Sequence, residues 1–177
     1  MNNKIKEMTY AGLLTALAII IPIQFGFLKI YIPPFSATLA AHVPMMLSMF
    51  ISPLVAVIVG IGSTVGFLVS GTPMPIVARA ATHIIVGYIG ARIIIKNKSY
   101  VKAAMITAPI HGLLEALVVI PFVGVDLYQL LIVTLVGGIL HHCADSVIAY
   151  GIVKAVAKAR KKEIYDVFGC IKISKTA

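Results

Sequence analysis

Apolar runs long enough to cross a lipid bilayer occupy most of this sequence, and they limit the possible folds more than any other feature. The 177 residues are 60% hydrophobic and only 12% charged, with a mean hydropathy of +1.02. Soluble domains carry about 25% charged residues, and a soluble core of this length could not hide so much apolar surface. The chain is therefore predicted to be an all-α membrane protein.

The apolar runs are separated by turn-forming segments rich in proline, glycine and serine. A bilayer core of about 30 Å needs roughly 20 apolar residues in a helix. We predict a bundle of six transmembrane helices over approximately residues 8–23, 36–51, 54–69, 76–95, 101–120 and 126–156. The second helix would be only about 24 Å long and contains Pro44, so a tilted or re-entrant helix is the alternative there. Before it, Pro33 and Pro34 oppose helix and favour an extended path.

Basic residues predict the orientation. Thirteen of the fifteen lysines and arginines fall on one side of the predicted bundle, and only Lys29 and Arg79 fall on the other. Because such residues gather on the cytoplasmic side, both termini are predicted to be cytoplasmic in a multi-pass protein of the bacterial plasma membrane. Residues 1–158 form the membrane domain, and residues 159–177 form a basic tail suited to anionic lipid. A signal peptide is the competing interpretation of the N-terminus, which lacks a convincing cleavage site.

Eight ionisable side chains interrupt the apolar runs. A charge in hydrocarbon costs at least about 2.5–3.5 kcal/mol on insertion scales, so such residues normally face the interior of a bundle or a water-filled cavity. The eight are His42, Arg79, His83, His111, Glu115, His141, His142 and Asp145. So many in one small bundle predict an internal polar site.

Spacings of four residues place some of these groups on common helix faces. Arg79 and His83 share one face, where the guanidinium offers bidentate donors to a carboxylate; snorkelling to the outer headgroups is the alternative. His111 and Glu115 share another face. Glu115 is predicted either to neutralise Arg79 within the bundle or to contact a ligand.

The remaining ionisable residues carry structural alternatives. His141 and Asp145 share a face of the last span, whereas His142 points about 100° away. For Asp145 we favour a histidine–aspartate hydrogen bond that joins two helices. His42 stands alone on the second run, and a single histidine in that setting is more often packed than ligand-binding.

Several chemistries have no support in the sequence. The H-E-x-x-H zinc pattern and the Met-His start of nickel and cobalt uptake subunits are both absent, so we predict no metal site and no cofactor, with transition-metal binding as the less favoured alternative. Cys143 and Cys170 suit neither a disulfide framework nor a metal motif. There is no P-loop for ATP hydrolysis, and a membrane enzyme using His111, Glu115 and His141 lacks a nucleophile–base signature.

Small residues mark one face of the first helix. The stretch Tyr10-Ala-Gly-Leu-Leu-Thr-Ala-Leu17 places Ala11, Gly12, Thr15 and Ala16 where backbones can approach closely, either inside the bundle or against a second membrane subunit. With the size, the six spans, the cytoplasmic ends and the basic start, this stretch resembles a substrate-binding S component of an energy-coupling factor (ECF) vitamin transporter. The resemblance covers about residues 6–158, although Gly12 and Ala16 replace the strict A-x-x-x-A of that family.

The resemblance implies a vitamin site near the outer face, a first loop that closes over it, and docking on a transmembrane coupling subunit that carries two ATPases. Three runs, residues 32–44, 49–53 and 70–83, are most similar to the niacin-type members. Nicotinate needs a cation for its carboxylate, a donor for its ring nitrogen and an apolar or aromatic slot. The expected binding residues are Arg79, His83, His42, Glu115, His111, His141, Phe35 and Tyr128, with Phe67 as a further aromatic side chain.

We therefore expect a substrate-capture subunit for a small anionic vitamin, with niacin favoured, which delivers the vitamin inward through an ATP-driven complex. It would catalyse no covalent chemistry and bind no nucleic acid, since the net charge of +9 reflects membrane topology. The alternative is a self-sufficient, proton-coupled secondary transporter of a small solute.

Overall fold

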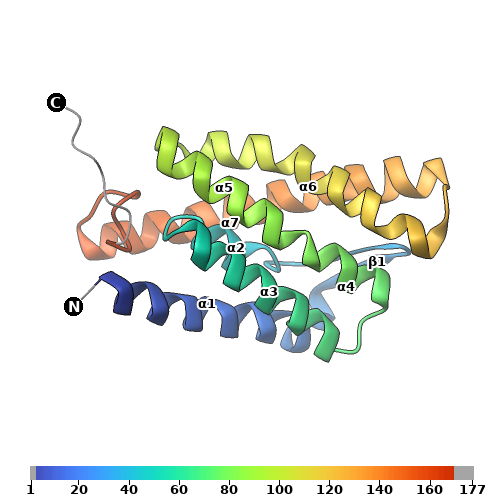
Figure 1. Cartoon of the computed structure of the whole chain (residues 1–177), viewed down its shortest axis with the longest axis horizontal. Helices are drawn as coiled ribbons and strands as arrows, with labels where there is room; N and C mark the ends of the chain where they lie inside the picture. Colours follow the sequence, from blue (N-terminus) through green and yellow to red (C-terminus); the bar gives the residue numbers. More distant parts are fainter. Residues whose placement is uncertain (1–2, 170–177) are drawn as a thin grey trace.

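Long helices running along a common axis build the molecule (Figure 1), and the computed structural model describes residues 3–169. The helices are α1 (Asn3–Gln24), α2 (Val43–Ser48), α3 (Pro53–Val69), α4 (Met74–Ala81), α5 (His83–Asn97), α6 (Tyr100–Val123) and α7 (Gly137–Arg160). The other elements are a 3₁₀ turn η1 (Gly26–Leu28), strands β1 (Lys29–Ile32) and β2 (Phe35–Thr38), and a π-helical stretch η2 (Tyr128–Val136) that continues into α7.

Among the described residues, four helical segments are long and apolar enough to cross a bilayer: Lys4–Gln24, Met74–Asn97, Tyr100–Val123 and Tyr128–Arg160. They coincide with the first, fourth, fifth and sixth predicted spans, which confirms a helical membrane protein. The third predicted span forms α3, an apolar helix of 17 residues. At 1.5 Å per residue, α3 is about 26 Å long, slightly less than the hydrocarbon core.

The second predicted span, residues 36–51, does not form a long helix. Its first residues form β2, and only the six residues of α2 are helical, a length of about 9 Å. Every residue of α2 is buried, and the helix packs against α1, α3, α5 and α7. The segment is apolar on all sides because protein surrounds it, not because it faces lipid. The re-entrant alternative is therefore closer to the structure than a full span.

Local sequence signals set several helix ends. Ser52 caps α3 by accepting a hydrogen bond from the backbone N–H of Val55 at 3.3 Å, and Pro53 follows at the first helical position. Ser99 caps α6 in the same way through the N–H of Lys102 at 3.1 Å. The fourth predicted span bends at Thr82, whose hydroxyl donates to the carbonyl of Arg79 at 2.6 Å, so that α4 and α5 meet there.

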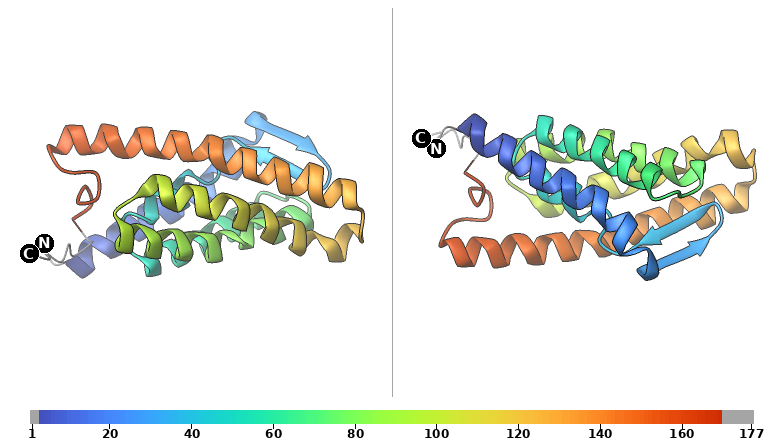
Figure 2. Two further views of the ribbon diagram at one scale, coloured as in Figure 1. Left: turned by 90° about the horizontal axis from the view of Figure 1, so that it is seen from above. Right: turned by 90° about the horizontal axis from the view of Figure 1, so that it is seen from below.

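A β-hairpin fills the connection between α1 and α2. Strands β1 and β2 pair antiparallel from Lys29 opposite Thr38 to Ile32 opposite Phe35, and a cis peptide bond joins Pro33 to Pro34 in the turn. The extended path predicted around these prolines is confirmed. Figure 2 shows the hairpin lying beside the helix formed by η2 and α7, and β2 contacts α7 directly.

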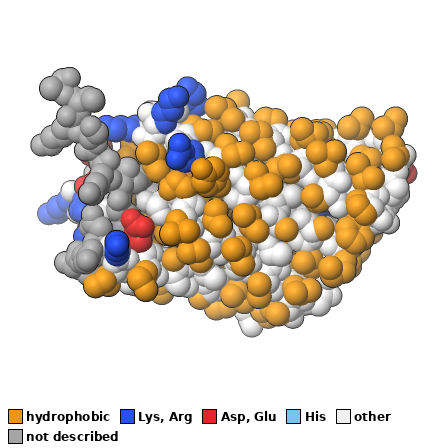
Figure 3. Space-filling view, viewed as in Figure 1, with side chains coloured by type: hydrophobic (Ala, Val, Ile, Leu, Met, Phe, Trp, Pro, Cys, Tyr) orange, Lys and Arg blue, Asp and Glu red, His pale blue; other side chains and the backbone are white. Residues whose placement is uncertain are grey.

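The first helix begins and the last helix ends at the same end of the bundle (Figure 1). Figure 3 shows lysine and arginine side chains gathered at this end, whereas the rest of the visible surface is largely apolar. Large apolar side chains such as Leu13, Leu117 and Val147 are exposed on the helices, as suits contact with acyl chains. The charge asymmetry predicted from the sequence is thus present in the fold.

The first part of the predicted basic tail, residues 161–169, packs on the helix ends. Val167 is buried, and the hydroxyl of Tyr165 accepts a hydrogen bond from the backbone N–H of Tyr100 at 3.1 Å. Arg160 donates to the hydroxyl of Tyr10 at 2.7 Å and to the carbonyl of Val167 at 3.1 Å. These contacts tie α7 to α1; residues 170–177 lie outside the described part of the chain.

Glycines allow α1 and α3 to approach closely. A Cβ atom on Gly66 would lie 2.7 Å from the Cα of Ile19, and one on Gly62 would lie 2.5 Å from the Cγ2 of Thr15. Because real Cβ atoms do not approach backbone so closely, any larger residue at position 66 would force the two helices apart.

Replacing Gly66 with alanine should therefore destabilise the protein by about 1–3 kcal/mol. The matched control is Gly151→Ala in α7, where an added Cβ meets nothing within 4 Å; it should leave stability unchanged or raise it by up to about 1 kcal/mol. Thermal unfolding of the purified variants measures both effects. Equal unfolding temperatures for the two variants would show that the α1–α3 contact is not tight.

Candidate functional site

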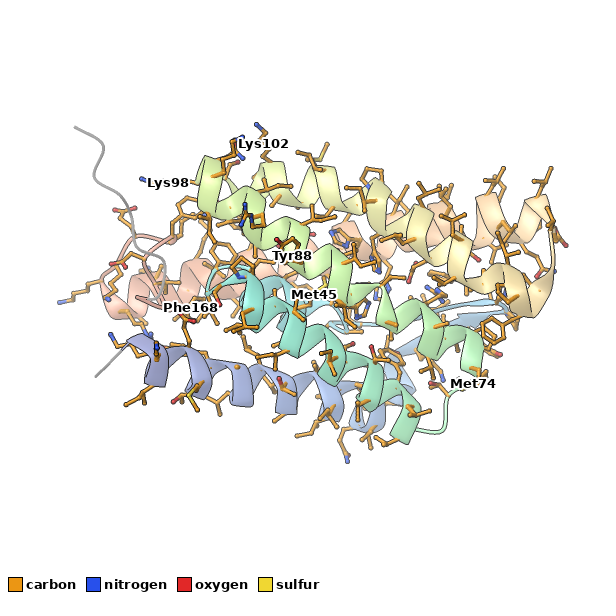
Figure 4. All side chains as sticks on the ribbon, viewed as in Figure 1. Met45, Met74, Tyr88, Lys98, Lys102 and Phe168 are labelled. Atoms are coloured by element: carbon orange, nitrogen blue, oxygen red, sulfur yellow. The ribbon has the colours of Figure 1, made fainter. Side chains whose placement is uncertain are left out.

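The helices bring the eight ionisable residues of the sequence analysis into one cluster. Arg79 lies in the last turn of α4, about 8 Å along the helix from Met74. Figure 4 shows Met74 at the opposite end of the bundle from Lys98 and Lys102. His83 begins α5. The other members come from the turn before α2, from α6 and from α7: His42, His111, Glu115, His141, His142 and Asp145. All eight are buried except His141, whose side chain is 9% exposed.

Arg79 and Glu115 form a buried ion pair. The Nη2 atom of Arg79 donates to the Oε1 atom of Glu115 at 2.9 Å, so the structure has the first of the two alternatives given for Glu115. The guanidinium carbon also lies 4.7 Å from the ring centre of Phe35, so the first residue of β2 covers the cation. Two guanidinium donors, Nε and Nη1, are buried without a hydrogen-bond partner among the described residues. The arginine therefore faces the interior of the bundle and does not snorkel to the lipid surface.

His42 lies at the centre of the imidazole cluster. Its ring centre is 4.2 Å from that of His141, 4.7 Å from His111, 4.8 Å from His83 and 5.8 Å from His142. His42 is packed, as expected for a single histidine in an apolar run, but it is not alone, because four other imidazoles surround it. The turn after β2 carries it inward, so residues far apart in the sequence meet around it.

Hydroxyl and carbonyl groups orient the other rings. The Nδ1 atom of His83 shares a hydrogen bond with the Ser63 hydroxyl at 2.8 Å, and the Nε2 atom of His141 donates to the carbonyl of Thr38 at 3.1 Å. His111 and His142 share a hydrogen bond between their Nδ1 atoms at 3.1 Å. Such partners fix the direction of an imidazole, and a carbonyl acceptor also fixes which ring nitrogen carries the proton.

Asp145 connects α7 to the turn before α2. Its carboxylate accepts hydrogen bonds from the backbone N–H groups of Ala40 at 2.9 Å and His42 at 3.0 Å. The Nε2 atom of His141 lies 3.3 Å from it and the Nδ1 atom of His42 lies 3.0 Å from it. Asp145 therefore has the structural joining role that the sequence favoured, here between a helix and a turn, and Ala40 has a positive φ of 68° within that turn.

A small cavity of about 20 Å³ lies among these groups, room for roughly one water molecule. Its walls come from β2, the turn before α2, α3, α4, α5, α6 and α7. The lining residues are Ser36, Thr38, Ala41, His42, Phe67, Ile76, Arg79, Ala80, His83, Glu115 and His141. In this conformation, the walls of the cavity lie close around the ion pair of Arg79 and Glu115.

Most of the expected binding residues meet at this cavity. Five of them line it: Arg79, His83, His42, Glu115 and His141. Phe67, the further aromatic, lines it too, His111 lies directly behind it against Glu115, and Phe35 covers Arg79. Tyr128 does not join them, because it sits at the start of η2 with 68% of its surface exposed.

Three polar residues of the site were not foreseen from the sequence: Ser36, Thr38 and Ser63. Serine and threonine are common in helices and turns, and these carry no distinctive spacing. The pairing of β2 and the packing of α3 on α5 bring them to the cluster.

The predicted docking residues of α1 divide between two directions. Ala11 is buried in the core, and Thr15 packs against Gly62 of α3. Gly12 and Ala16, one turn apart, are exposed. This pair leaves a flat strip on the outer surface of α1, as close helix–helix contact requires.

A multi-pass bundle that encloses charged and imidazole groups around an internal cavity defines a membrane protein that handles a small polar solute. No family profile and no solved structure matches the chain. The chain is 35% identical over 179 residues to the niacin transporter NiaX of Lactococcus lactis subsp. cremoris (strain MG1363), and the alignment covers 92% of this chain and 80% of NiaX. The chain thus belongs to the family of NiaX, the niacin-type S components of ECF vitamin transporters, which confirms the resemblance and the cell-membrane location.

Removal of the Asp145 carboxylate should destabilise the fold strongly. The Asp145→Ala variant leaves two backbone N–H groups buried without acceptors, a loss of about 2–5 kcal/mol. Asp126 offers a matched control, because its exposed carboxylate accepts the N–H groups of Tyr128 and Gln129. Asp126→Ala should cost no more than about 1 kcal/mol, since water replaces the lost acceptor. Thermal unfolding compares the two variants, and similar losses would contradict the joining role of Asp145.

Proposed function

We propose that this chain captures nicotinate in the cavity beside Arg79 and passes it to an ATP-driven ECF complex. The name of its relative, a niacin transporter, and the chemistry of the cluster support the same ligand. Nicotinate combines one carboxylate with a flat ring that bears a hydrogen-bond acceptor. The cluster offers a cation, imidazole groups and the two phenyl rings of Phe35 and Phe67.

The unpartnered donors of Arg79 carry the proposal. A buried N–H group without an acceptor costs about 1–3 kcal/mol, and more in a charged group, so two on one guanidinium are costly. A ligand carboxylate would accept from Arg79 in charge-assisted hydrogen bonds. Glu115 holds only one Nη2–H bond, so it can keep that contact while the ligand takes the remaining donors.

Ligand binding requires the site to expand. A cavity of about 20 Å³ cannot hold nicotinate, which has nine non-hydrogen atoms. The hairpin is the wall best suited to move, because β1 is largely exposed and β2 bears Phe35 over Arg79. In this proposal the hairpin opens to admit nicotinate, and Phe35 then packs on the bound ring. His83 or His42 would meet the ring nitrogen.

The proposal also covers the orientation of the chain in the membrane and the number of times it crosses. We place the basic end and both termini in the cytoplasm, according to the preference of lysine and arginine for that side. The cavity then lies toward the outer face. The chain would make six passages, with residues 39–52, including α2, forming an interior return path in place of a regular helix. The exposed strip of Gly12 and Ala16 would contact the transmembrane coupling subunit.

The first test is nicotinate binding to the Arg79→Gln variant. Loss of two charge-assisted hydrogen bonds should weaken binding at least 100-fold, measured by isothermal titration calorimetry on purified protein. Nicotinamide, which has no carboxylate, should bind wild type and variant about equally. Arg92→Gln, which changes an exposed arginine of α5, is the control and should bind nicotinate like wild type.

The same change leaves Glu115 as an unpaired buried charge, so a fold control is needed. The double variant Arg79→Gln with Glu115→Gln removes both charges and should fold yet still bind nicotinate poorly. Wild-type affinity in the folded double variant would remove Arg79 from the site. Uptake driven by a pH gradient in vesicles without ATPase subunits would instead support the proton-coupled alternative.

A second test separates capture from delivery. Gly12→Leu adds a large side chain to the exposed strip, where a Cβ meets nothing within 4 Å, so nicotinate binding should be unchanged. ATP-driven uptake with the coupling subunit and both ATPases should fall at least tenfold. Gly151→Leu, at an equally open position on α7, should retain uptake. Equal uptake by the two variants would place the docking surface elsewhere.

A further inference from the structure

A chain of hydrogen bonds fixes the tautomer of His111. The hydroxyl of Thr107 donates its proton to the carbonyl of Ala103 at 2.8 Å. The same oxygen must then accept from the Nε2–H of His142, which lies 3.0 Å away. In a neutral His142 ring, Nδ1 is therefore the acceptor, so His111 donates its Nδ1–H across the 3.1 Å contact. The Nε2 atom of His111 is left with a lone pair.

This lone pair points at no donor. Nε2 of His111 is fully buried without a hydrogen-bond partner among the described residues. The carboxylate atom Oε1 of Glu115 lies 3.6 Å from it. Oε2 of Glu115 is likewise buried and unpartnered. Two acceptors facing one another in an apolar bundle repel, and a cation between them removes the repulsion.

Two further imidazoles converge on the same place. The Nδ1 atom of His83 lies 2.8 Å from the Ser63 hydroxyl, and the Nδ1 atom of His42 lies 3.0 Å from the Asp145 carboxylate without forming a hydrogen bond to it. A proton on the Nδ1 atom of each ring, facing these oxygens, would leave Nε2 with its lone pair free for a metal ion. One imidazole nitrogen from each of His42, His83 and His111 lies within 4.8 Å of the others. A carboxylate beside the other ring nitrogen, as Asp145 lies beside His42, is common among metal-binding histidines.

We propose that His42, His83 and His111 form a three-histidine site for one divalent transition-metal ion of the zinc class. Imidazole nitrogens suit zinc, nickel and copper, and three of them leave a fourth position open. Zinc–nitrogen distances of about 2.0–2.1 Å bring tetrahedral ligands to about 3.3 Å from one another. The three nitrogens would therefore move inward by about 1 Å or less each. The ligands come from three separate elements, which is why no sequence spacing revealed them.

The charges of the cluster agree with such an ion. With neutral histidines, Arg79 carries one positive charge, while Glu115 and Asp145 carry one negative charge each. The cluster is thus one negative charge in excess, and a bound nicotinate would add a second. A single divalent cation neutralises both, which matters in a bilayer where unpaired charges are costly.

The open metal position suggests how the vitamin is recognised, and this half of the inference rests on the proposed function. Glu115 Oε1 contacts Arg79 at 2.9 Å and approaches His111 at 3.6 Å, so the cation site and the guanidinium are neighbours. A pyridine nitrogen is chemically similar to an imidazole nitrogen. A pyridine carboxylate would then place its ring nitrogen on the metal, in place of a direct contact with His83 or His42, and its carboxylate on Arg79.

The first experiment uses zinc alone. Full-length protein, purified without a histidine tag and washed with chelator, is titrated with Zn²⁺ by calorimetry, and its metal content is measured by mass spectrometry after gel filtration. One Zn²⁺ per chain is expected. Cobalt substitution should give the intense visible bands of a four-coordinate ion. Absence of saturable zinc binding would overturn the proposal without any variant.

Single substitutions locate the ligands. His83→Gln and His111→Gln should each weaken zinc binding at least tenfold, whereas His141→Gln should change it less than threefold. His141 is a strict control, because it belongs with His42 and Asp145 to a second group that could hold an ion. Loss of binding in His141→Gln with retention in His83→Gln would overturn the three-histidine assignment. Unfolding temperatures show which variants are folded. If one variant does not fold, the cobalt spectrum of the wild type still tests the metal site.

The last experiment links the metal to the vitamin. Chelation should weaken nicotinate binding to the wild type at least tenfold, and added Zn²⁺ should restore it. Proton uptake on nicotinate binding can be measured by calorimetry in buffers of different ionisation enthalpy. If chelation leaves the nicotinate affinity unchanged and binding takes up protons, then protons occupy the place assigned to the metal. Zinc binding without any nicotinate binding would overturn the proposed function while supporting the metal site.

Discussion

Arg79 carries a charge inside a bundle of apolar helices, where its side chain is only 3% exposed, and the rest of the site depends on how that charge is compensated. Glu115 neutralises it at 2.9 Å, which holds α4 against α6 and orients the guanidinium toward the interior. Removing either partner would leave a buried charge alone, at a cost of several kcal/mol. The same pair leaves the Nε and Nη1 donors of Arg79 and the Oε2 acceptor of Glu115 without hydrogen-bond partners among the described residues. The two charges balance each other, but these hydrogen-bonding groups remain unsatisfied.

Asp145 provides a second point of attachment, and it explains why the short α2 can be buried so deeply. The turn that precedes α2 exposes backbone N–H groups to the interior, where water cannot satisfy them. The carboxylate accepts two of these groups and lies beside the ring of His42. In this way α7 sets the position of the turn, and the turn brings His42 to the other histidines. Glycines at the α1–α3 contact also allow these two helices to pack closely.

The small size of the cavity has a functional meaning. In the contracted conformation Phe35 covers Arg79, and the space left is sufficient for about one water molecule. A capture subunit has to bind its ligand from dilute solution and later release it, so the walls of the site must change position. The hairpin is held mainly by its own ladder and by α7, whereas α4, α5 and α6 pack against one another within the bundle. The structure therefore places Arg79 and Glu115 on packed helices and Phe35 on the hairpin, the wall that we propose to move.

Hydropathy alone predicted the membrane class, and the placement of lysine and arginine predicted the polarity of the bundle, because both depend on the cost of moving a side chain out of water. The spacing of Arg79 and His83, and of His111 and Glu115, indicated their shared faces, since helical geometry is local. The same reasoning gave a wrong second span, because an apolar run inside protein looks like one inside lipid. It also placed Tyr128 at the site, whereas the structure has Tyr128 exposed at the start of η2. Only the tertiary structure decides which helices meet, and the meeting of α4, α5, α6, α7 and the turn before α2 creates the ion pair, the imidazole cluster and the cavity.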